Sequence, residues 1–540
     1  MSRKNTRMAK EAILIFFITA TMTTCISDRP EDENSSPQIA VDKEGNSYLT
    51  WIGHRISCDR TQDIFWTKIN SEGVRGPILK VSTHPDSTTS REWNPQIALD
   101  EQKNSYIVWQ GPDGEDSEIY WVKVDAEGVP GEAMKISTHP DNAHNDEYNA
   151  RIAVDGLGTS YVVWEGFDRY NDSDTFEKDI YWVKVDAEGV PGEVMKISTH
   201  PDNINYSDHS PEIVIDAEGN STVVWYGCDG EDCNYQLGDY EIYLVRINAE
   251  GIPGEVQKIS ALLDKTRNYH SFPQIAVDRN GNFYVAWFGG DEDNCGIYWV
   301  KIDTEGVPGE IQKISAHPDD VDSIGSNLRI AIDAEGNSYL TWQRCAGKYC
   351  AYGVGDYEIR WVKTDTRGIP SAVLTISVHP ENLEERVENP GIAVDAQGNS
   401  GLVWSGHRGH DIEVYWAKID AEGVPGKVLR LSTYPGSNKF DDEYPQITVD
   451  AEGNFYVTWN TVKWYVDEGI PQDMYWVRID AEGTPGKLQK ISVDDLDCES
   501  PREDYTYKMH SFTAVFQMYY FDSVGIALLL IFKCVVFIIQ

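Results

Sequence analysis

The feature that most constrains the fold of this chain is a unit that occurs eight times along the sequence. Each copy opens with a short apolar segment that ends in Asp, such as PQIAVD in the first and fifth copies. Successive copies begin at residues 37, 95, 150, 211, 273, 328, 390 and 445, and the repeated body extends to 498. Such self-similarity indicates modules that stack, because a single unit of this size cannot bury its own hydrophobic faces.

Each copy is predicted to form four short strands. In the second copy these are residues 95–100, 104–109, 118–125 and 132–137, which are rich in β-branched and aromatic residues. The first turn reads Asp-x-x-Gly-Asn and the third reads AEGVPGE or a close variant. Both suit tight hairpins, because Gly supplies positive φ and Asp or Asn bonds nearby backbone. No window carries a sustained helical period, so an α-solenoid is disfavoured.

Tryptophan usage favours closure of these modules into a ring. The second strand of every copy ends in Trp, at Trp51, Trp109, Trp164, Trp225, Trp287, Trp342, Trp404 and Trp459. Large side chains at fixed positions suit packing between adjacent sheets, and stacking on carbohydrate is the alternative. Ring closure buries both faces of every sheet. We therefore predict an all-β fold, an eight-bladed β-propeller of four-stranded antiparallel blades, with no blade shared between its two ends.

The motif I-A-V-D-x-x-G-N-x-Y-V-x-W resembles the first hairpin of NHL-type and related secreted bacterial and archaeal β-propeller repeats. It is also loosely similar to the Asp-box of sialidase-like propellers, although Asp42 stands three residues before Gly45 where that box has two. The resemblance covers roughly residues 37–493. It implies the propeller fold and leaves the activity open, because propellers host many functions.

Function is expected on one face of the ring. The first and third turns are short and similar in all copies, whereas the second and fourth connections are long and variable and lie on the opposite face. We call this the variable face. Acidic clusters recur there, and they make Ca²⁺ a candidate ligand or form a merely solvated rim. The candidate residues are Asp113, Glu115, Asp116, Asp229, Glu231, Asp232, Asp291, Glu292 and Asp293.

Cysteines concentrate in the same loops. Cys228 with Cys233, and Cys345 with Cys350, form two C-x4-C pairs. In an exported chain they are candidates for local disulfides. Zinc is the competing interpretation, but it needs four converging ligands, and the two loops belong to blades that are not neighbours.

The two ends of the chain carry apolar segments. Residues 1–27 show the basic-then-apolar layout of a signal peptide, with Cys25 placed as in a lipoprotein leader, and residues 28–36 form an acidic linker. Residues 499–522 are predicted to be a second linker, and 523–540 a possible C-terminal membrane anchor. We therefore expect an exported protein that is secreted or held at the cell surface.

Charge narrows the functional classes. The net charge of −42 argues against a nucleic-acid partner, because affinity for phosphate backbones comes from Lys and Arg. The sequence favours a non-catalytic binding or structural module that uses its acidic variable face toward an extracellular protein, a glycan or an envelope component. The alternative is a glycan-active hydrolase or lyase with its active site in the central depression; no catalytic residue can be singled out from the sequence.

Overall fold

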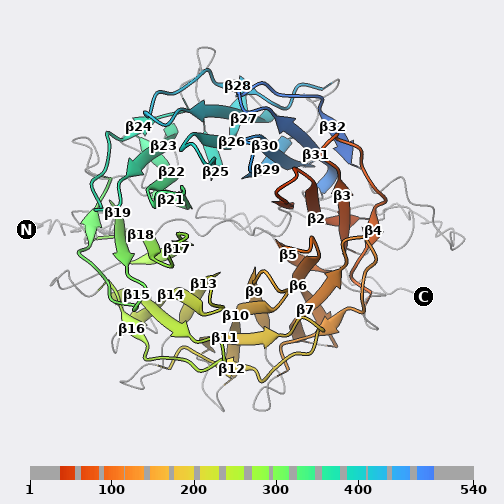
Figure 1. Ribbon diagram of the computed structural model, residues 1–540, viewed down its shortest axis with the longest axis vertical. Coiled ribbons are helices and arrows are strands. Elements are labelled where there is room, and N and C mark those ends of the chain that lie inside the picture. Colours follow the sequence, from red (N-terminus) through yellow and green to blue (C-terminus); the bar gives the residue numbers. More distant parts are fainter. Residues whose placement is uncertain are drawn as a thin grey trace, which may run out of the picture. The chain divides into compact units, whose positions relative to one another are not determined.

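The computed structural model describes residues 37–54, 62–83, 91–114, 116–138, 146–169, 176–199, 207–229, 239–260, 270–290, 296–315, 325–346, 356–377, 386–408, 411–434, 441–462 and 471–491. In these residues the chain forms strands only. The strands make eight antiparallel sheets, each of four consecutive strands, around a common axis (Figure 1). The prediction of an eight-bladed β-propeller is confirmed.

The strands of the first four blades, in chain order from the axis outward, are as follows: β1 (Gln38–Val41), β2 (Ser47–His54), β3 (Gln62–Ile69), β4 (Leu79–Lys80); β5 (Trp93–Leu99), β6 (Ser105–Asp113), β7 (Asp116–Val124), β8 (Met134–Lys135); β9 (Glu147–Val154), β10 (Ser160–Arg169), β11 (Phe176–Val185), β12 (Met195–Lys196); β13 (Asp208–Ile215), β14 (Ser221–Asp229), β15 (Asp239–Ile247), β16 (Gln257–Lys258).

The last four blades have the same order: β17 (Ser271–Val277), β18 (Phe283–Gly289), β19 (Gly296–Ile302), β20 (Gln312–Lys313); β21 (Gly325–Ile332), β22 (Ser338–Ala346), β23 (Asp356–Thr364), β24 (Leu374–Thr375); β25 (Val387–Val394), β26 (Ser400–Arg408), β27 (Asp411–Ile419), β28 (Leu429–Arg430); β29 (Asp441–Val449), β30 (Phe455–Val462), β31 (Pro471–Ile479), β32 (Gln489–Ile491).

The repeated Asp closes the first hairpin of each blade. In blade 1, Asp42 Oδ1 accepts the backbone N–H of Asn46 at 2.8 Å, and Asp42 Oδ2 accepts the Asn46 amide at 2.6 Å. Gly45 has φ +80°, and a Cβ there would lie 2.6 Å from the hydroxyl of Tyr456 in blade 8. The turn therefore needs glycine for its conformation and for the close approach of the neighbouring blade.

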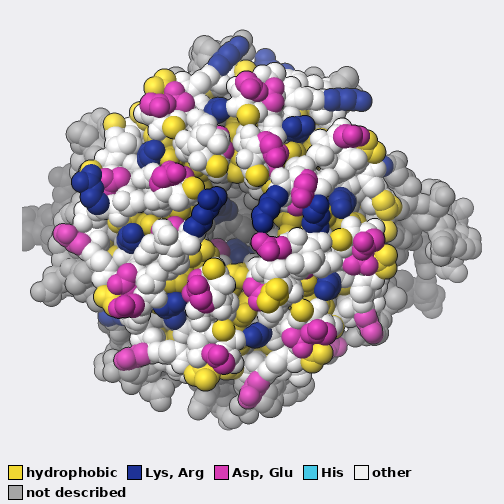
Figure 2. Space-filling model, in the orientation of Figure 1, with side chains coloured by type: hydrophobic (Ala, Val, Ile, Leu, Met, Phe, Trp, Pro, Cys, Tyr) yellow, Lys and Arg dark blue, Asp and Glu magenta, His cyan; other side chains and the backbone are white. Residues whose placement is uncertain are grey.

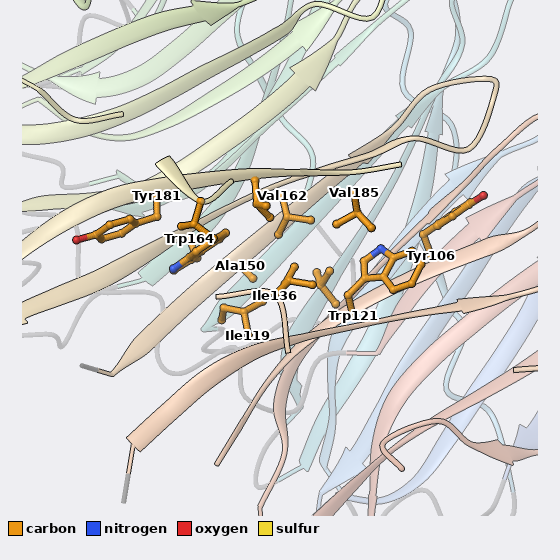
Figure 3. Close-up of a cluster of buried hydrophobic side chains, with 12 residues drawn as sticks. Tyr106, Ile119, Trp121, Ile136, Ala150, Val162, Trp164, Tyr181 and Val185 are labelled. Carbon is orange, nitrogen blue, oxygen red and sulfur yellow. The ribbon is translucent and has the colours of Figure 1, made fainter. Parts of the chain in front are cut away.

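The hydrophobic core lies in the seams between blades. Figure 3 shows one seam, where Ile119 and Trp121 of blade 2 meet Val162 and Trp164 of blade 3. All eight tryptophans of the second strands are at most 4% exposed, and each of these strands continues beyond its tryptophan instead of ending there. Burying an aromatic or branched side chain contributes about 1.5–3 kcal/mol, so the seams supply most of the stabilisation of the ring.

Polar contacts tie neighbouring blades at fixed sequence offsets. Trp66 Nε1 donates to Ser105 Oγ in the next blade at 3.1 Å, and Trp476 of blade 8 makes the same bond to Ser47 of blade 1 at 3.2 Å. Gln489 Nε2 also donates to the carbonyl of Gly73 at 2.6 Å. Among the described residues the ring closes by packing of blade 8 on blade 1, and these blades share no strand; the segments before 37 and after 491, which could add one, lie outside the described residues.

The face that carries the short turns is also tied together between blades. Lys123 Nζ donates to the carbonyl of Ala187 at 3.1 Å, and Lys184 Nζ donates to the carbonyl of Ala249 at 2.7 Å. Acidic, basic and apolar side chains are interspersed on the face shown in Figure 2, which is hollowed at its centre. The short turns are needed for these contacts between blades. The connections of the variable face do not make these contacts, so their sequences can differ between blades.

In the described part of the chain no helix is long and apolar enough to cross a membrane. The predicted leader (1–27), the linkers (28–36 and 499–522) and the predicted anchor (523–540) lie outside the described residues.

Candidate active site

The residues proposed for Ca²⁺ fall largely outside the described part of the chain. Six of them are not described at all, and the side chain of Asp229 is not described either. The six are Glu115, Glu231, Asp232, Asp291, Glu292 and Asp293. Asp113 is engaged by Lys135 Nζ at 2.7 Å, and Asp116 pairs with Asp113 across the tip of the same hairpin. Among the described residues no group of three or more His, Cys, Asp or Glu is placed to hold a metal ion. Calcium binding stays a prediction.

The cysteine pairs are described at one end only. Cys228 and Cys345 are buried at the variable-face ends of β14 and β22. Cys233 and Cys350 lie outside the described residues. The pairing within each loop therefore stays a prediction.

Buried polar residues at the start of the inner strands have a structural role. Trp109 Nε1 donates to Glu92 Oε2 at 2.8 Å, and Trp225 Nε1 donates to Asp208 Oδ1 at 2.9 Å. His270 and Asp442 accept in the same way from the tryptophans of blades 5 and 8. These side chains satisfy indole N–H groups inside the seams, so they are not available to a ligand.

A β-bulge reshapes the inner strand of blades 2 to 8. The register shifts where the strand passes the tryptophan, and one non-glycine residue in each bulge has a left-handed backbone. These residues are Asn94, Asn149, Ser210, Phe272, Asn327, Asn389 and Tyr444, with φ between +49° and +56°. Bulges re-aim side chains and are frequent beside active sites. Here they lie close to the axis, at the variable-face end of the innermost strands (Figure 1). We call this region the mouth.

Glu165 is the most unusual side chain at the mouth. It follows Trp164 in β10, and its carboxylate is only 2% exposed. Oε1 accepts Asn149 Nδ2 and the backbone N–H of Ser210, both at 2.8 Å, while Lys178 Nζ lies 3.0 Å from Oε2. Burial alone would raise the pKa of Glu165, but His209, Lys178 and the Ser210 amide lower it well below its ordinary value. The carboxylate is therefore ionised at any physiological pH.

His209 lies beside this carboxylate and remains accessible. Its Nδ1 is 3.8 Å from Glu165 Oε2, and its side chain is 19% exposed. The imidazole stacks on Tyr226, its cross-strand partner in β14, with ring centroids 5.2 Å apart. An accessible imidazole beside a carboxylate is a side chain that can take and return a proton.

Aromatic rings flank the charged centre on both sides. Tyr148 meets Phe167 edge to face at 5.4 Å, and Lys178 Nζ lies 4.9 Å from the Phe167 centroid. On the other side, Tyr226 contacts Phe272 of blade 5 at 5.3 Å. Half-buried aromatic side chains beside a few polar groups are the usual lining of a small-molecule or sugar site.

A polar chain of contacts runs across the same blades on their inner strands. Arg151 Nε lies 3.1 Å from Glu212 Oε1, and Gln274 Nε2 donates to the same oxygen at 3.2 Å. These contacts link the inner strands of blades 3, 4 and 5 to one another around the axis. Arg151 pairs with Glu212 and Lys178 pairs with Glu165, and the pKa of Glu165 is lowered, whereas a general acid for glycoside hydrolysis needs a raised pKa.

Carboxyl groups with strongly raised pKa values lie in the seams instead. Burial raises the pKa of Asp442 to about 8, although Tyr434 and Trp459 both donate to its Oδ1. Burial also raises the pKa of Asp179 to about 6, and Lys196 and Ser198 hold it. Asp442 is fully buried, so it serves the packing and offers no proton to a ligand.

Sequence reasoning missed the residues of the mouth. The position after the second-strand tryptophan differs in almost every copy: Ile52, Gln110, Glu165, Tyr226, Phe288, Gln343, Ser405 and Asn460. The residue that precedes the bulge differs in the same way and includes His209. Comparing copies for what they do not share, rather than for what they share, is the signal that could have found this site.

Comparison with known proteins found similar solved structures but no family. No family model and no curated protein matches the sequence. Among solved structures the chain is similar to an ulvan lyase of polysaccharide lyase family PL25, bound to a saccharide of GlcA and Rha3S, with 11% identity, a TM-score of 0.45, and coverage of 86% of this chain and 97% of that one. It is also similar to the polysaccharide lyase Uly1, with 10% identity, a TM-score of 0.42, and coverage of 82% and 89%.

A third similar structure is an α-L-arabinanase of Penicillium chrysogenum in complex with arabinobiose, with 12% identity, a TM-score of 0.38, and coverage of 64% of this chain and 96% of that one. At such identities the likeness concerns the fold. No family match supports the specific resemblance to NHL-type or sialidase-like repeats.

One expectation from the sequence is wrong. We expected a non-catalytic binding or structural module, but the similar structures reported above are two polysaccharide lyases and an arabinanase. The mouth of this chain also holds a His–Tyr pair beside an ionised carboxylate, which a structural rim does not need. The expectation was wrong because it was based on the many acidic residues of the variable loops and did not consider the few residues that depart from the repeat.

Proposed function

We propose that this protein is a glycan-active enzyme whose active site is the mouth of blades 3 to 5. The observation that carries the proposal is His209, stacked on Tyr226 and placed beside the buried, ionised Glu165. The polysaccharide lyases and the arabinanase of similar fold make a polysaccharide a reasonable substrate to test.

The chemistry of the side chains favours elimination over hydrolysis. Hydrolysis needs two free carboxyl groups, one of them protonated, whereas Glu165 and Glu212 are both held by cations. In elimination, His209 removes the proton on the carbon next to a uronate carboxylate. That electron pair forms a C=C bond, the bond to the glycosidic oxygen breaks, and the Tyr226 hydroxyl protonates the leaving oxygen.

Three neighbours prepare this step. Glu165 lies beside the imidazole, with its Oε2 3.8 Å from Nδ1. Lys178 and Arg151 pair with Glu165 and Glu212 and are the cations that would face a substrate carboxylate here; positive charge at that carboxylate favours the enolate-like state that forms as the proton leaves. The aromatic rings exclude water and offer apolar surfaces to the sugar faces.

The test is an assay of the full chain on ulvan, alginate and arabinan. Elimination produces an ultraviolet-absorbing unsaturated uronate, whereas hydrolysis produces reducing ends without that absorbance. We expect unsaturated product, and we expect His209→Ala to lose at least about a hundredfold in rate. His407→Ala is the matched control, because His407 also lies beside a carboxylate, Glu388, but in blade 7. Equal losses in both variants, or no cleavage of any polymer, would contradict the proposal.

We also propose that the protein is exported and acts outside the cytoplasm. The basic-then-apolar layout of residues 1–27 supports this, and so does a polymeric substrate. Fractionation of cells that express the full chain should place it outside the cytoplasm, and deletion of residues 1–27 should retain it inside. A full chain recovered from the cytoplasm would contradict export.

A further inference from the structure

The bulge positions of the inner strands differ in a way that packing alone does not explain. Four of the seven are Asn, and two of these use their amides locally: Asn149 donates to Glu165, and Asn327 donates to Asn389 Oδ1 at 3.2 Å. Asn tolerates the left-handed conformation because its short polar side chain bonds nearby groups. Blades 5 and 8 instead carry Phe272 and Tyr444, with φ +50° and +56°. A bulky residue with this backbone is strained, and such strain persists only where the surrounding structure fixes the conformation, as the bulge does in blades 2 to 8.

Phe272 is the strained aromatic that meets the mouth. Its ring contacts Tyr226 at 5.3 Å with planes inclined by 52°, and Tyr226 stacks on His209. Phe272 is half-buried, since one part of it packs against the seam between blades 5 and 6. Tyr444 adopts the same conformation in blade 8, which lies across the ring from blade 4. The chain thus contains one strained aromatic at the proposed site and a second one away from it.

We propose that Phe272 is a substrate-binding residue that stacks on the sugar unit next to the one that reacts at His209. The proposal rests on the glycan-active function above and adds to it a second sugar subsite on blade 5. An aromatic side chain gives a pyranose an apolar surface, and the contact with Tyr226 and the packing against the seam already hold this partly exposed ring in position. The left-handed backbone is what brings a side chain of this size to the mouth.

The test compares three variants of the full chain: Phe272→Asn, Phe272→Tyr and Tyr444→Asn. Phe272→Asn puts the residue that four other blades use into the same bulge, so the fold should tolerate it. We expect KM for the cleaved polysaccharide to rise about tenfold while kcat changes less than about twofold. Phe272→Tyr retains an aromatic ring and should keep the wild-type KM. Tyr444→Asn relieves the same strain in blade 8 and should leave both constants unchanged.

The outcomes separate the two proposals. An active wild type with an unchanged KM in Phe272→Asn would overturn this inference and leave the proposed function standing. Equal losses in Phe272→Asn and Tyr444→Asn, with matching falls in melting temperature, would mean that the aromatic rings only support the fold, and would also overturn it. A wild type that neither binds nor cleaves ulvan, alginate or arabinan would overturn the proposed function, and this inference with it.

Discussion

At the scale of single residues, the buried charges of the mouth and those of the seams behave in opposite ways. Glu165 has three donors and a nearby imidazole, which stabilise its anion in spite of burial. Asp442 accepts from two neutral donors on one oxygen, and burial dominates and raises its pKa. Surroundings rather than depth decide which carboxyl group keeps its charge.

Glu165→Gln should destabilise the protein at pH 7 by about 2–3 kcal/mol, because the variant leaves Lys178 half-buried without its counter-ion. The folded-state pKa of Glu165 lies below its unfolded value of about 4.3. Its contribution is therefore complete above that pH and is lost as the pH falls toward the folded-state pKa. Urea unfolding should show a gap between variant and wild type that narrows at pH 3. A gap independent of pH, or an equal effect of the exposed control Glu188→Gln, would contradict this.

Asp442→Asn should have the opposite pH dependence. Because the folded-state pKa of about 8 lies above the unfolded value of about 3.9, the wild type loses stability as the pH rises between the two. The amide oxygen of Asn can still accept from Tyr434 and Trp459 without carrying a charge. We expect the variant to exceed the wild type at pH 9 by at least about 1.4 kcal/mol, the equivalent of one pKa unit, and to differ little at pH 3, below the unfolded pKa. Melting curves at the two pH values measure this, and a variant that is weaker at both would refute it.

At the scale of elements, the consensus of the eight copies predicts the repeated turns, but it does not predict the bulges or the residues of the mouth. The repeated Asp and Gly predict the tight hairpins, and the repeated Trp predicts the closed ring. These predictions succeed because the same turn hydrogen bonds and the same buried tryptophan recur in each blade. Glu165, His209 and Phe272 stand at positions where the copies disagree. Residues that differ between copies do not appear in a consensus sequence. The inner strands of blades 3, 4 and 5 also come together only in the folded ring.

The first hairpin of blade 2 offers a test of turn chemistry. Lys103 has φ +70° at the place where the other seven copies have Gly. Lys103→Gly should raise the melting temperature by about 1 °C, because relief of the left-handed strain outweighs the lost surface pair with Glu44. Calorimetry of the variant checks this. The reverse change in blade 1, Gly45→Lys, should lower the melting temperature clearly, since a Cβ there meets Tyr456; a fall in Lys103→Gly would mean that the surface pair is the larger effect.

At the scale of the whole molecule, the seam between blades 8 and 1 differs from all the others. Consecutive blades are joined by the chain, whereas this seam is held by side-chain contacts: Trp476 to Ser47, Gln489 to Gly73, and the packing of Met474 and Ile491 against Leu49. No strand in the described part of the chain is shared across it. Opening of the ring should therefore begin here, since local unfolding starts where the fewest connections resist it.

Ser47→Ala tests this through its matched partner Ser105→Ala. Each variant leaves one buried indole N–H, that of Trp476 or Trp66, without its acceptor, at a cost of about 1–2 kcal/mol. Because the chain still joins blades 1 and 2, Ser105→Ala should accelerate hydrogen exchange little in the flanking strands. Ser47→Ala should accelerate it selectively in β1, β2, β31 and β32, which border the unjoined seam. Equal acceleration at the two seams would show that side-chain packing alone closes the ring as firmly as a covalent connection does.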